Sequence, residues 1–142
     1  MATIRISASA EPLFPFCRSS STCLEDACFT TYAELIIFAA SMGYEKCAGS
    51  KPSEPKVFFS NPYPVDFSIF KGEMYPIILL ICLATAHSHK IAQDEDKMAR
   101  VIEAYAEAGF RELEGILKNS TPADFNYTLA HRFTQVLKTS ET

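Results

Sequence analysis

The stretch TYAELIIFAASMGYEKC, residues 31–47, decides how this chain folds. Its single charge before Glu45 is Glu34, and apolar side chains recur at the three- and four-residue spacing of an α-helix. Ile37 and Phe38 fall outside that stripe, so apolar groups occur on nearly every side. A helix that is apolar all round is buried between other elements. The stretch therefore predicts a sandwiched helix over residues 31–42, capped by Thr30 and ending at Gly43.

A second segment has the same character: PIILLICLATA, residues 76–86. Its eleven residues are too few to cross a bilayer, which requires about 20, so it predicts a buried helix opened by Pro76. A chain of 142 residues can enclose one such helix, but covering two is harder. We therefore expect one of the two helices to lie at a self-association interface, most simply in a symmetric homodimer.

A third helix is predicted after residues 94–96, three acidic residues that suit the positive end of a helix dipole. The spacing places one set of side chains inward, namely Met98, Val101, Ile102 and Tyr105. It places a polar set toward water, namely Arg100, Glu103, Glu107 and Arg111, with Glu107 and Arg111 one turn apart. Gly109 is expected to break or bend the helix.

The remaining segments predict a minor β component. TIRIS at residues 3–7 fits a short strand, and residues 56–71 fit a small β-hairpin around the turn sequence NPYP. A last helix is predicted over residues 122–137. We interpret residues 1–28 as a strand and loop extension and residues 29–138 as one helical domain. The predicted fold class is mainly α with a minor β part: a compact domain of four to six helices with one small hairpin.

The composition excludes some classes of protein. A formal charge of −4 argues against a freestanding nucleic-acid-binding protein, which usually carries a basic excess. The five cysteines are an odd number, and the first residues lack the apolar run of a secretory signal. We expect a cytoplasmic protein whose cysteines are mostly free thiols, with no membrane-spanning segment.

Enzymatic chemistry has one candidate cluster: Cys82 with His87 and His89, a thiol and bases close in sequence. The plainer interpretation makes Cys82 a small buried apolar residue and the histidines polar groups at a helix C-terminus. The cysteines do not show the close pairs of zinc sites, and the glycines form no phosphate-binding loop. No metal and no cofactor is predicted, and a non-enzymatic protein is favoured.

A basic, aromatic-rich segment is the remaining candidate site. Residues 46–71 carry four lysines against Glu54 and Asp66, and phenylalanines are interleaved among them. On an exposed hairpin, Lys51, Lys56 and Lys71 would contact a nucleic-acid backbone while the aromatic rings stack on bases. The alternative is that these rings are the buried face of the hairpin.

Two segments together resemble a known family. FTTYAELIIFAASMGYEK is similar to the early helix of small accessory proteins encoded with bacterial Dnd, or DNA phosphorothioation, systems. RVIEAYAEAGFRELEGIL is similar to the later signature of that family. The matching positions are Thr31, Tyr32, Phe38, Ala39, Ala40, Gly43 and Tyr44 in the first segment, and Ile102, Glu103, Tyr105, Ala106, Gly109, Phe110 and Leu113 in the second. Where the family pattern has Asn-Gly-Gly, this chain has Glu107, Ala108 and Gly109.

The resemblance implies a role in the replacement of a phosphate oxygen of DNA by sulfur and in the associated restriction of foreign DNA. It implies protein partners in a DNA modification and restriction complex, with DNA contact as an additional expectation. It implies no catalytic residues. The alternative, independent of the resemblance, is a small cysteine- or metal-dependent enzyme that uses Cys82, His87 and His89.

Overall fold

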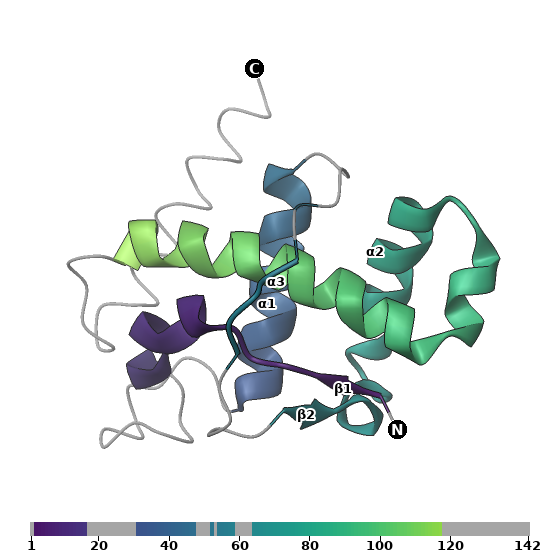
Figure 1. The fold of residues 1–142 in the computed structure, drawn as a ribbon, viewed down its shortest axis with the longest axis horizontal. Helices are drawn as coiled ribbons and strands as arrows, with labels where there is room; N and C mark the ends of the chain where they lie inside the picture. Colours follow the sequence, from purple (N-terminus) through teal and green to yellow (C-terminus); the bar gives the residue numbers. More distant parts are fainter. Residues whose placement is uncertain (1, 17–30, 48–51, 53, 59–63, 118–142) are drawn as a thin grey trace.

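The computed structural model describes residues 2–16, 31–47, 52, 54–58 and 64–117 of the chain. In this part of the chain, helices dominate, and one small antiparallel sheet accompanies them (Figure 1). The predicted mainly α fold class is confirmed. The predicted cap Thr30, the residue Lys51 and the helix expected over residues 122–137 lie outside the described residues.

The helix α1 (Tyr32–Lys46) is sandwiched as predicted, and its apolar residues are buried on several sides. Its N-cap is Thr31, whose hydroxyl accepts a hydrogen bond from the Glu34 amide at 3.2 Å. The prediction that the helix ends at Gly43 is wrong, because the helix continues through Gly43 to Lys46. Gly43 serves instead as a point of close helix contact.

The helix α3 (Glu95–Leu117) runs across α1 in Figure 1, and these two helices form the main packing contact of the described residues. Met98, Ile102 and Tyr105 are buried on its inner face, as predicted. The predicted break at Gly109 is wrong, since α3 is continuous there. A Cβ atom on Gly109 would overlap the main chain of Ala39 on α1, so glycine is needed for close approach.

The helix α2 (Tyr75–Ala86) lies near the N-terminal half of α3 (Figure 1). Its inner face buries Ile78, Ile81 and Cys82. The chain leaves α2 through His87, which adopts a left-handed backbone with φ of 54°, and a short 3-10 helix, η4 (His89–Gln93), leads into α3.

The N-terminal strand β1 (Thr3–Ile4) pairs antiparallel with β2 (Val65–Asp66), and Ser7 forms an isolated bridge with Phe58. The predicted first strand therefore pairs with the 56–71 segment. That segment supplies β2 as the partner of β1 and Phe58 as the partner of Ser7. The predicted continuation of the second hairpin strand is wrong, because Phe67–Phe70 form a 3-10 helix, η3. Asp66 starts that turn by accepting a hydrogen bond from the Ser68 amide.

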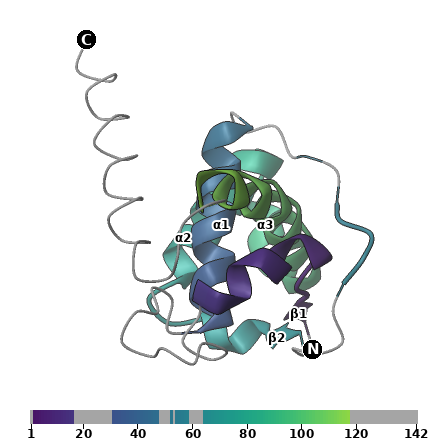
Figure 2. The same ribbon diagram turned by 90° about the vertical axis from the view of Figure 1, so that its left-hand side faces the viewer.

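The 3-10 helix η1 (Ala8–Phe16) follows β1 and packs on α3 (Figure 2). Its Phe14 ring meets Tyr32 of α1 edge-on, with the ring centroids 5.4 Å apart. Ile4, Ile6 and Leu13 are buried, so the N-terminal segment contributes side chains to the core. The N-terminal segment thereby covers one face of α3 along much of its length.

Candidate functional site

Two buried carboxylates lie on the face of α3 that the N-terminal segment covers. Glu103 and Glu107 are one helical turn apart and are only 2% and 8% exposed. The prediction that this polar set faces water is wrong for both. Their hydrogen-bond donors Arg5, Ser7 and Ser9 lie about a hundred positions away in the sequence, so the helical spacing of α3 did not indicate that another segment covers this face.

Glu103 is held by two arginines. Arg5 donates to it three times, from its main-chain amide at 2.7 Å, from Nε at 3.0 Å and from Nη2 at 2.9 Å. These hydrogen bonds raise the pKa of Arg5 above its ordinary value, against the opposing effect of desolvation. Arg100 lies 3.4 Å from Glu103 and also donates to the Thr3 carbonyl oxygen at 2.8 Å. The guanidinium of Arg5 is stacked over the Phe58 ring, 3.9 Å from its centroid.

Glu107 accepts hydrogen bonds from two serine hydroxyls. Ser7 donates to one carboxylate oxygen at 2.5 Å, and Ser9 donates to the other at 2.6 Å. Arg111, one turn further along α3, forms an ion pair with Glu107 at 3.1 Å, which confirms the predicted one-turn pairing. Buried carboxylates are stable only when paired and hydrogen-bonded in this way. These contacts fix the Glu107 carboxylate in one orientation.

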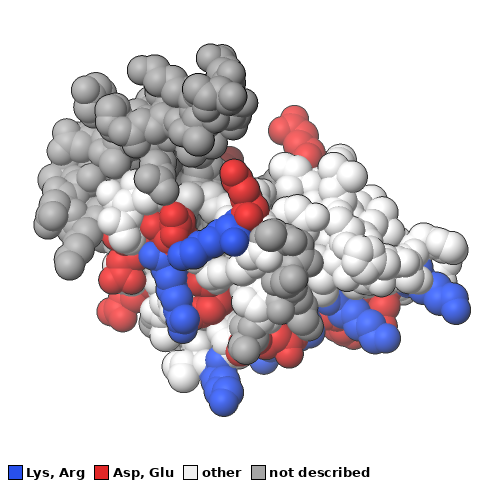
Figure 3. All heavy atoms as spheres, turned by 90° about the horizontal axis from the view of Figure 1, so that it is seen from above, with Lys and Arg blue, Asp and Glu red and all other residues white. Residues whose placement is uncertain are grey.

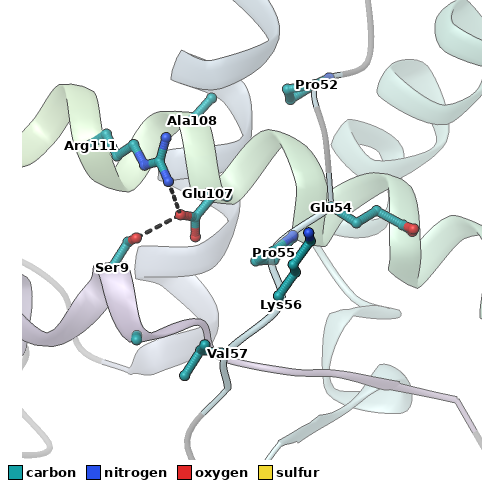
Figure 4. Close-up of a pocket in the computed structure, with 10 residues that line it drawn as sticks. Ser9, Pro52, Glu54, Pro55, Lys56, Val57, Glu107, Ala108 and Arg111 are labelled. Carbon is teal, nitrogen blue, oxygen red and sulfur yellow. Dashed lines mark hydrogen bonds and ion pairs between the residues drawn. The ribbon is translucent and has the colours of Figure 1, made fainter.

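A pocket opens beside Glu107, with a volume of about 580 Å³. Figure 4 shows Ser9, Glu107 and Arg111 on one side and Pro52, Glu54, Pro55 and Lys56 on the other. Its polar lining consists of Ser9, Glu54, Lys56, Glu107 and Arg111, and its apolar lining of Ala8, Pro52, Pro55, Val57 and Ala108. The volume lies within the range of small-molecule pockets. Sequence reasoning missed Ser9, Glu107 and Arg111 as site residues and singled out Lys56 alone.

The two described lysines of the predicted basic patch lie apart. Lys56 lines the pocket near Glu107. Lys71 follows η3 and forms an ion pair with Glu95, at the start of α3, with a distance of 2.8 Å. Glu107 lies twelve positions after Glu95 in the same helix, which corresponds to about 18 Å along the helix axis. Lys56 and Lys71 therefore belong to opposite parts of the α3 surface.

The predicted enzymatic cluster is split between interior and surface. Cys82 is completely buried, and its thiol lies 3.8 Å from the Met98 carbonyl oxygen, to which it donates. Desolvation raises the pKa of Cys82 to about 12, which keeps the thiol protonated near neutral pH. His87 and His89 are exposed beyond the end of α2. Over the residues that the structure describes, no group of three or more His, Cys, Asp or Glu side chains is arranged to hold a metal ion.

The outer face of α2 is exposed and uncharged. Leu80 is 69% exposed, Ile77 is 39% exposed, and the twelve residues of α2 include no charged side chain. Figure 3 shows uncharged atoms over much of the right-hand side of the molecule, where α2 lies. No helix within the described ranges has both the length and the apolar character that crossing a bilayer demands.

The fold and these sites define a small, mainly helical domain with a polar pocket and an apolar helix face. The chain belongs to the family described as DNA sulphur modification system-associated protein 4, whose model matches residues 4–139. The predicted resemblance to Dnd-associated accessory proteins is thus confirmed. Comparisons with curated proteins and with solved structures gave no match. The two segments that carried the resemblance are the helices that cross at Gly43 and Gly109, α1 and α3.

Proposed function

We propose that this protein is a non-enzymatic accessory protein of a DNA phosphorothioation and defence system, and that it acts by binding other proteins. Membership of the family supplies the association with DNA sulfur modification. The observation that carries the binding role is the exposure of Leu80 on a helix without charges. Exposed apolar surface of this kind commonly marks an interaction site.

The two faces of α2 support this interpretation. Its inner face, with Ile78, Ile81 and Cys82, already forms the contact with the core. A surface helix normally carries polar side chains on its outer face. Here the outer face presents Ile77 and Leu80, at helical spacing, toward solvent. Covering them on association would gain roughly 25 cal/mol for each Å² of apolar surface buried.

The proposed arrangement is a homodimer in which α2 packs against its own copy, with further protein partners in the modification complex. A symmetric interface joins the same patch of both subunits, so a patch of like charge would repel itself. The uncharged α2 avoids that repulsion. Of the two helices predicted to be apolar all round, α1 is covered within one chain, which leaves α2 for the interface.

Sedimentation velocity at micromolar concentration tests the dimer. The variant Leu80→Glu places a charge at the centre of the outer face, so we expect it to sediment as a monomer while the unaltered protein sediments as a dimer. Ile69→Glu is the matched control, because Ile69 is 59% exposed and lies outside α2. A monomeric unaltered protein would contradict the homodimer. Equal binding of Leu80→Glu and the unaltered protein to the purified modification proteins would contradict the wider role of α2.

The proposal also includes contact with DNA at Lys51, Lys56 and Lys71. Lys56 and Lys71 are exposed, whereas Phe67 and Phe70 are buried and cannot stack on bases, so the proposed contact is with the DNA backbone. Charge reversal at Lys56 and Lys71 should weaken DNA binding and flatten its salt dependence. Binding that keeps its strength and its salt slope in the double variant would reject these lysines as the contact.

A further inference from the structure

We propose that the pocket beside Glu107 binds a nucleoside monophosphate group, with the phosphate on Arg111 and Lys56 and an N–H edge of the base on Glu107. This inference goes beyond the proposed function, since the pocket is a different surface from α2 and shares only Lys56 with the proposed DNA contact. It depends on the lining of the pocket and on the fixed orientation of the buried carboxylate.

The cationic side of the pocket suits a phosphate. Arg111 has five N–H donors, and its ion pair with Glu107 is formed through Nη2. Its side chain is 72% exposed. Lys56 stands across the cavity from Arg111 (Figure 4). Guanidinium and ammonium groups that converge on one cavity are the usual partners of phosphate oxygens.

The acidic lining residues differ in their relation to the cavity. Glu54 extends away from Glu107 and Arg111 in Figure 4, and its charge acts on Arg5. Glu107 is 8% exposed, and its carboxylate lines the cavity together with Arg111 and Lys56. An anion without a hydrogen-bond donor would be repelled by Glu107. The pocket therefore selects a ligand that combines an anionic group with N–H donors.

Glu107 has the capacity to accept such a donor. A carboxylate offers about four acceptor positions, and Ser7, Ser9 and Arg111 fill three of them. The remaining position can accept one N–H donor, such as the exocyclic amino group of a base. Guanine carries such an amino group, so guanosine monophosphate serves as the probe. The apolar lining residues Pro52, Pro55 and Val57 provide surface for the faces of the base.

Titration calorimetry with guanosine monophosphate, ribose 5-phosphate and inorganic phosphate tests the proposal. Ribose 5-phosphate retains the anion and lacks the base, so we expect it to bind at least about tenfold more weakly than the nucleotide. Equal binding of the two, or no binding of the nucleotide at millimolar concentration, would overturn the proposal.

Variants locate the binding site. Arg111→Gln and Lys56→Gln alter exposed side chains and should each weaken nucleotide binding several-fold, whereas Lys97→Gln, at an exposed site outside the pocket, should leave it unchanged. Glu107→Gln should abolish the preference for the nucleotide over ribose 5-phosphate. Glu103→Gln is its matched control, because Glu103 is equally buried but does not line the pocket. Loss of binding in Lys97→Gln, or its retention in Arg111→Gln, would assign the nucleotide to another surface.

The nucleotide group can come from free nucleotide or from an unpaired base of a nucleic-acid strand, and competition distinguishes these sources. Displacement of guanosine monophosphate by a short single-stranded oligonucleotide supports the pocket and identifies a strand as the source. Lack of displacement, with nucleotide binding intact, supports the pocket and identifies the free nucleotide. Neither result depends on Leu80, so failure of the α2 interface and failure of this pocket are distinguishable. Lys71 does not line the pocket, so Lys71→Glu tests the proposed DNA contact separately from the nucleotide.

Discussion

Gly43 of α1 and Gly109 of α3 meet where the two helices cross, and the main chains there are too close for side chains. A Cβ atom on Gly43 would lie 3.0 Å from the Gly109 amide nitrogen and would overlap the Tyr105 carbonyl oxygen. Glycine inside a helix usually costs about 1 kcal/mol relative to alanine. Here the crossing offsets that cost, since it lets the buried residues of α1 and α3 pack closely.

We expect Gly43→Ala and Gly109→Ala each to lower the free energy of unfolding by about 3 kcal/mol. The clash is with the main chain rather than with a flexible side chain, so relief requires the helices to separate. Chemical denaturation followed by circular dichroism measures the loss. A change of less than about 0.5 kcal/mol in both variants would mean that the helices do not cross this closely.

Gly115 provides the matched control within the same helix. It lies in α3 with no atom near the position of a Cβ. Gly115→Ala should therefore raise the free energy of unfolding by up to about 1 kcal/mol, through helix propensity alone. A lower free energy of unfolding in Gly109→Ala and a higher one in Gly115→Ala would separate the effect of helix packing from that of helix propensity.

Thr31 should stabilise the start of α1 as its N-cap. Its hydroxyl oxygen accepts the hydrogen bond of the Glu34 amide, so Thr31→Ala should cost about 1 kcal/mol. Thr31→Ser keeps the hydroxyl and should cost much less. Equal losses in the two variants, measured by denaturation, would show that the methyl group of Thr31 matters more than its hydroxyl.

Glu103 should be far more important to stability than a surface ion pair. Glu103→Ala would leave two arginines near an empty buried position, with an expected cost of about 3 kcal/mol. Lys46 and Glu112 form an exposed pair at 2.8 Å, so Lys46→Ala should cost less than about 1 kcal/mol. Hydrogen exchange should also increase at Ile4 and Ile6 in Glu103→Ala, because Arg5 loses its anchor. Protection unchanged at those amides would contradict the anchoring role.

The helices were largely predictable because each leaves a local pattern. Residues 31–42 carry one charge, Glu34, and residues 76–86 carry none; both stretches have helix-spaced apolar groups, and α1 and α2 occur there. The glycines misled the prediction, because Gly43 and Gly109 have the signature of helix ends and breaks. Their true role depends on the opposing helix, which no local pattern reveals. The cap at Thr31 differed from the prediction by one residue, within the usual uncertainty of helix boundaries.

The pocket was much less predictable than the helices. Glu103 and Glu107 have the spacing of a solvated helix face, and that pattern is correct when nothing covers the helix. The cover comes from Arg5, Ser7 and Ser9. A short strand at residues 3–7 was the available signal, and it did not specify its neighbour in space. Pairing over such a sequence separation depends on tertiary packing rather than on local propensity.

Cys82 should be chemically inert in the folded protein and should link stability to pH. Its pKa is raised by burial from the ordinary 9.0 to about 12, so the unfolded chain loses this proton first as pH rises. The contribution of the buried Cys82 thiol to the free energy of unfolding is therefore complete below about pH 9. Between about pH 9 and about pH 12 it falls by roughly 1.4 kcal/mol per pH unit. Comparing the unfolding free energy of the unaltered protein with that of Cys82→Ala cancels every other titration. The difference should narrow as pH rises.

Thiol labelling read out by peptide mass spectrometry gives an independent check at pH 8. Cys82 is completely buried and Cys47 is partly exposed, so Cys47 should be modified first in the folded protein and both equally fast in urea. This order follows because the thiolate is the reactive species and burial suppresses it. Rapid labelling of Cys82 in the folded protein, together with a pH-independent difference in stability, would contradict the buried neutral thiol. It would favour instead the enzyme hypothesis built on Cys82, His87 and His89.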